Sequence, residues 1–498
     1  MPHAPPSAGP RSAVVDLGSN SVRLVVFEGH GRNPLTIFNE KAVLRLGKGL
    51  QGSGRLNDEA VAAAMPVMQR YHAVGRAMGV ETFEVLATAA VRDAANGPAF
   101  VASLGDAMPG VPIRILSGEE EAALSAAGLL CGIPAADGVL ADIGGGSLEL
   151  VQVAGGGFGQ ARSLPLGVIR LGDRAEGDLI RARLIADADL GGVGWLGQGA
   201  GRDLYLVGGA FRALARIHLM QNAYPINIVH QYAIEREAAR EFAASVAGSS
   251  RRILERLAGA PRRRVDDLPL AAIVLRRLLR ATSARRVVFS ANGIREGWYM
   301  QARSEAVRAQ EPLLAAGQDM ARQFGRDPAL PPALAAWTAP LFPDEGADAR
   351  RQREAACWMS DIGAHDHPEY RAEQAYLRVL RQPGVGLDHP TRAFLALTLA
   401  LRYEAESDAP FLTSARSLLD PAAASRAEVL GTALRLAYTL SAGTPDLLGR
   451  TALQRDTGRL TLRLSEGGGV FAGESILRRL GRLAGTMGLE AKIAHMSA

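Results

Sequence analysis

The sequence predicts an α/β protein made of two related domains, followed by a mainly helical region. Three observations predict this fold class. A strand–loop–strand segment occurs twice, apolar strands alternate with helices up to about residue 304, and helical periodicity dominates from residue 305 onward. A chain of 498 residues is also too long for one hydrophobic core, so several domains are expected.

The composition is that of an ordinary globular protein, with 48% hydrophobic and 21% charged residues. No apolar stretch approaches the ~20 residues of a membrane-spanning helix, so we expect no membrane partner. The start of the chain lacks the apolar segment of a signal peptide, and residues 1–11 are predicted to be a disordered tail. Cys131 and Cys357 form neither a disulfide framework nor a metal-binding spacing, which favours a cytoplasmic protein.

The net charge of +5 is carried mostly by arginine, because Lys41, Lys48 and Lys492 are the only lysines. Arginines cluster at residues 262–264 and again between residues 276 and 286. Such clusters suggest a polyanionic partner, either nucleic acid or polyphosphate. Solvated helix faces carry similar runs, so charge by itself leaves the partner open.

The first strand–loop–strand segment, residues 14–28 (VVDLGSNSVRLVVFE), has a second copy at residues 139–153 (VLADIGGGSLELVQV). In the alignment of the two copies, Asp16 matches Asp142 and Ser21 matches Ser147. Two related units about 126 residues apart predict two similar domains that face each other across a cleft. The alternative is a chance match of two glycine-rich hairpins without a ligand.

The residue types of the two loops suit phosphate. Glycine lets the backbone approach a ligand closely, and successive N–H groups and hydroxyls in a tight turn form an anion-binding nest. A carboxylate at the strand end is a ligand for Mg²⁺, which accompanies phosphate. Glu149 replaces Arg23 of the first copy and lies on the same strand face as Ser147. It is therefore either a further metal ligand or a surface acid.

Between and after the two copies, local signals predict further elements. Residues 57–78 are predicted to be a helix capped by Asn57 or Asp58. Ser117 caps a second helix, whose first turn holds residues 119–121, all glutamate. The segments at 207–210 (VGGA) and 290–297 (SANGIREG) each begin a helix at the end of a strand, a natural anion site.

In the helical region, four residues suggest either a metal site or ordinary helix caps: Asp361, His365, Asp366 and His367. An alternating stretch within the last 60 residues predicts a small sheet.

Five motifs occur in order along residues 14–300: DLGSNS, SGEEEA, DIGGGSLEL, VGGA and SANGIREG. Together they resemble the exopolyphosphatase/guanosine pentaphosphate phosphohydrolase family of the actin-like ATPase superfamily. The resemblance implies two actin-like (ribonuclease H-like) domains at 12–130 and 131–304 with an interdomain cleft. It also implies an all-α HD-like domain at 305–440 and a small α+β domain at 441–498. The histidine of the HD metal signature is replaced at Ser360, so no second hydrolase site is expected.

The resemblance also implies an activity, the release of terminal orthophosphate from inorganic polyphosphate by in-line attack of water. It places the general base at Glu121, with Glu120 as second choice, and a fixed positive charge at Arg92. Candidate phosphate ligands are Asn20, Ser21, Gly145, Gly146, Ser147, Gly208 and Gly209, and candidate Mg²⁺ ligands are Asp142, Glu149 and Asp16. The alternatives are a guanosine pentaphosphate phosphohydrolase with the same site and a non-catalytic polyphosphate sensor. A homodimer is expected, and no nucleic-acid partner.

Overall fold

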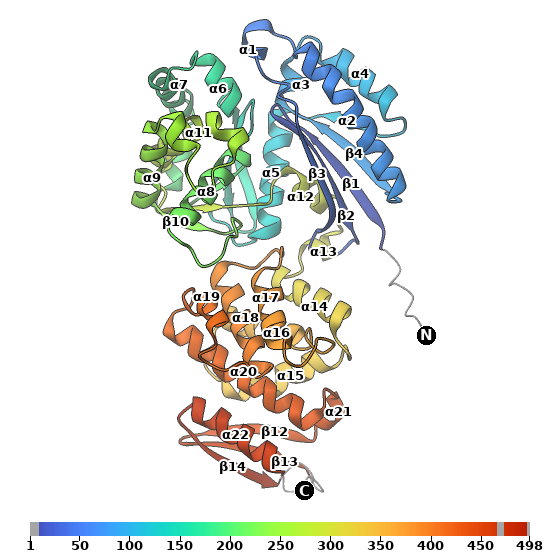
Figure 1. The fold of residues 1–498 in the computed structure, drawn as a ribbon, viewed down its shortest axis with the longest axis vertical. Helices are drawn as coiled ribbons and strands as arrows, with labels where there is room; N and C mark the ends of the chain where they lie inside the picture. The colour runs from blue at the N-terminus through green and yellow to red at the C-terminus, as the bar shows by residue number, and fades with distance from the viewer. Residues whose placement is uncertain (1–8, 466–472, 496–498) are drawn as a thin grey trace. The chain divides into compact units, whose positions relative to one another are not determined.

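The computed structural model describes residues 9–465 and 473–495, and the chain divides into two compact units, residues 1–309 and 310–498 (Figure 1). Among the described residues, no helix is both long and apolar enough to cross a bilayer. The first unit holds a five-stranded and a six-stranded sheet with their helices, and the second holds the helices from residue 312 onward and a three-stranded sheet.

The first sheet has the strand order β3-β2-β1-β4-β5. Strands β1, β2 and β3 are antiparallel neighbours, whereas β4 and β5 run parallel to β1. The predicted helix at 57–78 is confirmed as α2, and the side chain of Asn57 caps it by accepting a hydrogen bond from the Ala60 amide at 2.9 Å. The elements of this part are β1 (Arg11–Leu17), β2 (Ser21–Glu28), β3 (Leu35–Val43), α1 (Leu50–Ser53), α2 (Asp58–Ala77), β4 (Thr82–Ala87), α3 (Ala89–Asp93), α4 (Gly97–Ala107) and β5 (Ile113–Ile115).

The second sheet repeats this topology. Its order is β10-β11-β9-β6-β7-β8, with β6, β7 and β8 antiparallel and with β9 and β11 parallel to β6 and to each other. Strands β8, β7, β6, β9 and β11 therefore correspond in order to β3, β2, β1, β4 and β5 of the first sheet. Strand β10 has no counterpart there and is an added antiparallel edge strand. The predicted duplication is therefore confirmed. The strands are β6 (Gly138–Ile143), β7 (Leu148–Ala154), β8 (Gly157–Leu164), β9 (Asp203–Val207), β10 (Ala233–Glu235) and β11 (Arg286–Phe289).

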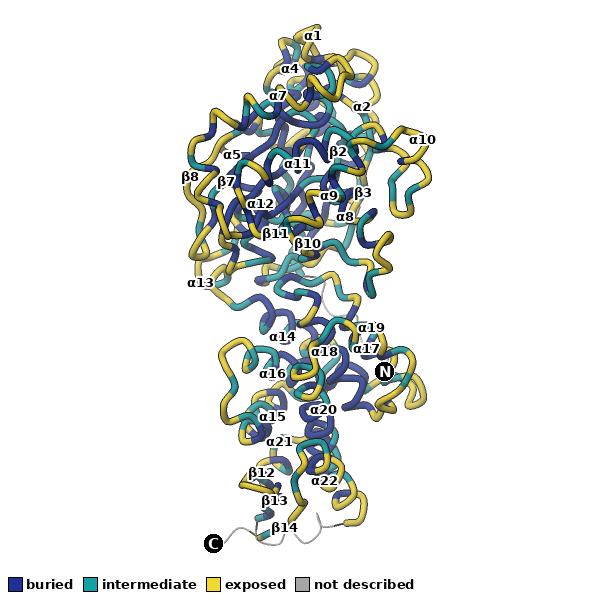
Figure 2. The backbone as a smooth tube through the Cα atoms, turned by 90° about the vertical axis from the view of Figure 1, so that its left-hand side faces the viewer, coloured by how far each residue is buried: buried dark blue, intermediate teal, exposed yellow. Residues whose placement is uncertain are grey.

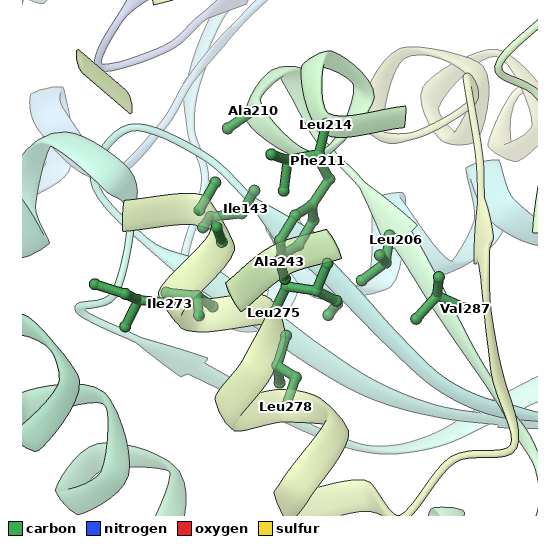
Figure 3. Packing of buried hydrophobic residues seen from close by; sticks show 14 of the residues in the cluster. Ile143, Leu206, Ala210, Phe211, Leu214, Ala243, Ile273, Leu275, Leu278 and Val287 are labelled. Carbon is green, nitrogen blue, oxygen red and sulfur yellow. The ribbon is translucent and has the colours of Figure 1, made fainter. Parts of the chain in front are cut away.

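Helices cover both faces of the second sheet, which is why every residue of β6 and β9 is buried. On one face, Phe211 and Leu214 of α8 pack with Leu275 and Leu278 of α11 against the strands (Figure 3). In the tube coloured by burial, dark blue runs through the interior of this unit and yellow marks its outer turns (Figure 2). The helices of this part are α5 (Gly118–Gly132), α6 (Val168–Arg174), α7 (Leu179–Gly191), α8 (Gly209–Gln221), α9 (Arg236–Gly248), α10 (Arg251–Leu254), α11 (Leu268–Thr282), α12 (Ile294–Gln301) and α13 (Glu305–Arg308), with 3₁₀ turns at Leu196–Gly199 and Arg262–Asp267.

Helices α5 and α12 lie between the two sheets and cross each other closely (Figure 1). A Cβ atom on Gly128 of α5 would lie 1.9 Å from the carbonyl oxygen of Gly293, and one on Gly297 of α12 would lie 1.9 Å from that of Leu124. Only glycine permits this approach at either position. The crossing holds the start of α12, and with it the SANGIREG motif, beside α5.

The chain enters the first sheet earlier than the sequence suggested. The predicted tail covered residues 1–11, but β1 begins at Arg11. The Arg11 guanidinium donates hydrogen bonds to the Glu28 carboxylate at 3.1 Å and to the Met78 carbonyl oxygen at 2.7 Å, which fixes this end of the strand. The rest of the predicted tail, residues 1–8, lies outside the described residues.

The second unit is helical with a small sheet at its end, in the order β12-β13-β14. It forms one compact unit, so the predicted boundary between 305–440 and 441–498 stays a prediction. The elements are α14 (Pro312–Phe324), α15 (Leu330–Thr338), α16 (Ala347–Met359), α17 (Arg371–Leu380), α18 (His389–Arg402), α19 (Thr413–Arg416), α20 (Pro421–Ser441), α21 (Pro445–Leu448), β12 (Thr451–Asp456), β13 (Arg459–Leu464), α22 (Glu474–Thr486) and β14 (Glu490–His495), with 3₁₀ turns at Ala339–Leu341 and Pro410–Leu412.

The possible metal site in this unit is not supported. Asp361 is buried and accepts hydrogen bonds from Arg326 at 2.8 and 2.9 Å, whereas His365 and His367 are exposed. Within residues 9–465 and 473–495, no three His, Cys, Asp or Glu side chains converge closely enough to hold a metal ion by themselves. The Asp361 carboxylate serves an ion pair instead.

Candidate active site

A pocket of about 140 Å³ in the first unit is lined by both copies of the repeated loop. Most of the predicted site residues meet there, although they come from distant parts of the sequence. The lining includes the predicted residues Asp16, Asn20, Ser21, Glu121, Asp142, Gly145, Gly146, Ser147, Glu149, Gly208 and Gly209. Two predicted residues, Glu120 and Arg92, are not part of the lining.

The two loops have the same internal geometry. The amide of Gly18 donates to the carbonyl oxygen of Ser21 at 3.1 Å, and that of Gly144 donates to the carbonyl oxygen of Ser147 at 3.0 Å. The loops also touch each other, because a Cβ on Gly146 would lie 2.7 Å from the Ser19 hydroxyl. Glycine at this position lets the second loop close against the first, so both loops present backbone and hydroxyl groups to one ligand.

Two cross-strand pairs place charged side chains beside the loops. Asp16 on β1 is opposite Arg23 on β2, and Asp142 on β6 is opposite Glu149 on β7. Directly opposed residues of an antiparallel pair project from the same face of the sheet. The repeat therefore places one acidic and one basic side chain beside the loop of the first domain. In the second domain it places two acidic side chains there.

Two serines, one buried and one half-buried, hold the two acids of the second domain. The Ser125 hydroxyl donates to Asp142 Oδ2 at 2.5 Å, and the Ser163 hydroxyl donates to Glu149 Oε1 at 2.9 Å. Burial raises the pKa of Asp142 to about 6. Burial, followed by the neighbouring charges of Glu121 and Asp142, raises the pKa of Glu149 well above its ordinary value. Burial also raises the pKa of Asp16. These carboxylates would therefore gain from a nearby cation.

Glu120 and Glu121 are neighbours on α5 but have different surroundings. Glu120 is exposed and accepts a hydrogen bond from the Ser117 amide at 2.7 Å, while the Ser117 hydroxyl accepts one from the Glu120 amide at 3.1 Å. This reciprocal capping box occupies the Glu120 carboxylate. Glu121 is only 3% exposed and lines the pocket, so of the two candidates Glu121 is the one that belongs to the pocket.

Arg92 contacts Glu121 directly. Its Nη1 donates to Glu121 Oε1 at 2.7 Å and to the Leu116 carbonyl oxygen at 2.8 Å, which fixes the carboxylate in one orientation. Burial raises the pKa of Glu121 to about 7 even though Arg92 acts in the opposite direction. The structure therefore gives Arg92 a positioning contact with Glu121, and its contact with phosphate stays a prediction.

Sequence reasoning missed the positive side of the pocket. Five cationic side chains from five different segments line it: Arg23, Lys41, Arg212, Arg264 and Arg295. Burial and then the neighbouring Arg295 lower the pKa of Arg23 and of Arg212 to about 10. Burial and then Arg264 lower the pKa of Lys41 to about 8. The five charges thus repel one another, and a multiply charged anion would relieve that repulsion.

Some of these cations had a signal in the sequence. Arg264 belongs to the arginine cluster at 262–264, Arg295 lies within the SANGIREG motif, and Arg212 follows the VGGA segment. Lys41 lies on β3 directly opposite Arg23 of β2. Its place in the pocket depends on this strand pairing, which the sequence does not reveal.

Comparisons with known proteins match both units. Residues 24–305 match the family model described as the Ppx/GppA phosphatase family, and residues 313–494 match the one described as exopolyphosphatase, C-terminal. The chain is 35% identical over 151 residues to exopolyphosphatase 2 of Mycobacterium tuberculosis, which is 28% of this chain and 47% of that protein. It is 37% identical over 163 residues to an uncharacterized protein of Streptomyces coelicolor, or 32% of this chain and 48% of that protein. The chain thus spans about half the length of the curated relatives it matches.

Solved structures show the same fold. An exopolyphosphatase from Cytophaga hutchinsonii matches with a TM-score of 0.54 at 23% identity, over 58% of this chain and 97% of that one. The Aquifex aeolicus PPX-GPPA enzyme matches with a TM-score of 0.50 at 22% identity, over 58% of this chain and 98% of that one. The likeness agrees with the two sheets of repeated topology in the first unit.

Proposed function

Because the chain belongs to the Ppx/GppA phosphatase family, we propose that it hydrolyses the terminal phosphoanhydride bond of inorganic polyphosphate and releases orthophosphate. One observation carries the proposal. A single pocket joins four carboxylates and five cationic side chains around two phosphate-type loops. A cationic surface suits a substrate that is a chain of negative charges, and buried carboxylates suit the activation of water and the binding of a metal ion. A relative named exopolyphosphatase 2 supports this substrate class.

The cations and loops bind the substrate in this proposal. Arginine presents a planar fork of donors that matches phosphate oxygens, and four of the five cations are arginines. Asn20, Ser21 and Ser147 add side-chain donors, while Gly145 and Gly146 add backbone amides at the contact between the loops. The amino end of α8, at Gly208 and Gly209, has amides that lack intrahelical partners and the positive end of a helix dipole, and both would favour another phosphate.

Glu121 is the proposed general base. Its carboxylate is held by Arg92, and with a pKa of about 7 it is substantially ionised at neutral pH. It accepts a proton from a water molecule whose oxygen forms a bond to the terminal phosphorus. The bond from that phosphorus to the bridging oxygen breaks, and the shortened chain leaves as an anion. A well-placed base contributes on the order of 10²–10⁴ to the rate of such a step.

Mg²⁺ is the proposed cofactor, with one or two of the candidates Asp142, Glu149 and Asp16 as direct ligands and the rest acting through bound water. The donor set fits this ion, because Mg²⁺ is usually held by one or two carboxylates together with substrate phosphates and water. Such binding needs no cluster of three protein ligands, and among the described residues there is none. When bound, the ion would offset the negative charge of the phosphoryl group being transferred. Ser125 and Ser163 fix the orientation of Asp142 and Glu149 for that purpose.

Phosphate release from long-chain polyphosphate, with Mg²⁺ and with excess EDTA, tests the proposal. We expect release with Mg²⁺ only. A higher kcat/KM on guanosine pentaphosphate than on polyphosphate would reassign the substrate while keeping the site. Tight binding of polyphosphate without any phosphate release would identify a sensor and refute hydrolysis. Location in the cytoplasm and a homodimeric state stay predictions.

A further inference from the structure

The second unit contains a pocket whose walls are mostly arginine. It has a volume of about 350 Å³ and is lined by Arg326, Arg371, Arg402, Arg435, Tyr438, Thr439, Ala442 and Arg479. The lining comes from the segment after α14 and from α17, α18, α20 and α22, which are far apart in the sequence. None of these residues belongs to the pocket of Glu121. Five guanidinium groups around one cavity require a physical explanation, because like charges repel.

The positive charges of this arginine pocket exceed the negative charges paired with them. Asp361 accepts hydrogen bonds from Arg326 and lies 3.8 Å from Arg402. Glu404 accepts hydrogen bonds from Arg435 and Arg479. Five guanidinium groups and these two carboxylates leave an excess of three positive charges. Burial lowers the pKa of Arg435, and the charge of Arg479 lowers it further, although Glu404 acts in the opposite direction. The pairing inside the pocket therefore compensates the charge only in part.

Donor atoms of the pocket are also unused. The Nε atoms of Arg371, Arg402, Arg435 and Arg479 are buried and have no hydrogen-bond partner among the described residues. Arg402 is only 4% exposed, so bulk water does not compensate its charge. A buried donor without a partner destabilises the folded state, and the cost is larger when the donor is charged. Excess positive charge around a cavity, part of it shielded from bulk water, is the feature of an anion site.

The aromatic residues indicate which kind of anion fits. The Arg402 guanidinium lies 3.7 Å from the ring centroid of Tyr438 and 4.0 Å from that of Tyr403. Arg326 and Arg371 add longer contacts to these same two rings, at 6.0 and 5.6 Å. The rings are thus engaged in cation–π contacts that hold the arginines in place, and they are not presented for stacking with a nucleobase. The recognition chemistry is that of an inorganic oxyanion.

We propose that the arginine pocket is a second anion site, which binds a compact, multiply charged phosphate such as inorganic phosphate, pyrophosphate or a short segment of polyphosphate. A phosphate group carries more than one negative charge and several acceptor oxygens, and arginine binds it through paired hydrogen bonds. A single carboxylate would neutralise only one of the three excess charges. Anion binding at the arginine pocket does not require hydrolysis. The proposal can therefore be tested independently of the activity proposed above.

Hydrogen exchange of the full-length chain, read by mass spectrometry, tests the site directly. Every protein sample carries Glu121→Gln, so that phosphate chains are not hydrolysed during the measurement. Added NaCl keeps the ionic strength equal in all samples. With saturating pyrophosphate we expect several-fold slower exchange in peptides from the ends of α18 and α20 and from α22. Protection by inorganic phosphate alone would identify free phosphate as sufficient, whereas protection only by pyrophosphate or longer chains would identify a phosphoanhydride.

Two arginines of α22 provide a matched pair of variants. Arg479→Gln removes a lining residue that is half-buried, and we expect it to abolish most of the protection. Arg478→Gln removes the same charge from the exposed face of the same helix, and we expect protection to remain. Arg435→Gln on α20 repeats the test from a second helix. No protection by any phosphate in these peptides, or equal loss in Arg478→Gln and Arg479→Gln, would overturn the proposal. Tenfold tighter binding of GTP than of tripolyphosphate would overturn the inorganic assignment.

Discussion

Replacing Glu121 by glutamine separates the catalytic use of this carboxylate from its cost to stability. The amide has the same shape, and its oxygen can still accept the hydrogen bond from Arg92 that Glu121 accepts at 2.7 Å. It cannot accept the proton of water. We therefore expect Glu121→Gln to lower turnover on polyphosphate by a factor on the order of 10²–10⁴, with little change in binding.

The same substitution should stabilise the protein above neutral pH. Burial raises the pKa of Glu121 from 4.5 to about 7, so the unfolded chain loses this proton at a lower pH than the folded protein does. Between these two values the folded state binds more protons, and its stability falls as pH rises. At 1.36 kcal/mol for each pH unit, the full penalty is about 3 kcal/mol and is present above pH 7. Glutamine has no such penalty.

The two effects need two assays. Phosphate release with Mg²⁺ gives turnover, and urea unfolding in EDTA at pH 5 and pH 8 gives the free energy of unfolding. From pH 5 to pH 8, the wild type should lose up to about 3 kcal/mol relative to Glu121→Gln. Glu120→Gln is the matched control, because glutamine also closes a capping box and Glu120 lies outside the pocket lining. If Glu121→Gln keeps more than half of wild-type turnover while Glu120→Gln loses it, the assignment of the base is wrong.

Three further predictions concern the metal, the pH profile and the second unit. Asp142→Asn and Glu149→Gln should each raise the Mg²⁺ concentration needed for half-maximal activity, and full wild-type activity in excess EDTA would contradict this. Lys41, with a pKa of about 8, is charged below that pH and neutral above it, so kcat/KM on polyphosphate should fall as pH rises through about 8. This fall should be absent in Lys41→Arg, and an identical profile in both proteins would exclude Lys41. A chain ending at residue 309, the end of the first compact unit, should still cleave short polyphosphates but release long ones as intermediates, because contacts beyond the catalytic pocket add affinity for a long polyanion. Degradation of long chains without intermediates on a gel would show that the second unit has another purpose.

Several features followed from the sequence because they depend on contacts between near neighbours. The predicted cap at Ser117 closes within the first turn of its helix, and each phosphate loop closes within a single hairpin. Strand alternation placed Glu149 on the face of Ser147, and the duplicated pattern predicted two related sheets. Local hydrogen bonds and side-chain periodicity depend only on residues that are close in the sequence. These elements could therefore be predicted without knowledge of the fold.

Tertiary structure decided which of these residues act together. The sequence marked both Glu120 and Glu121, but burial in the pocket and the contact with Arg92 distinguish Glu121. The family resemblance assigned Arg92 to phosphate, whereas the fold pairs it with the proposed base. The five cations of the catalytic pocket and the five arginines of the second unit each come from segments far apart in the chain. No local pattern encodes such groupings, because they arise only when helices and sheets pack and bring distant charges to one place.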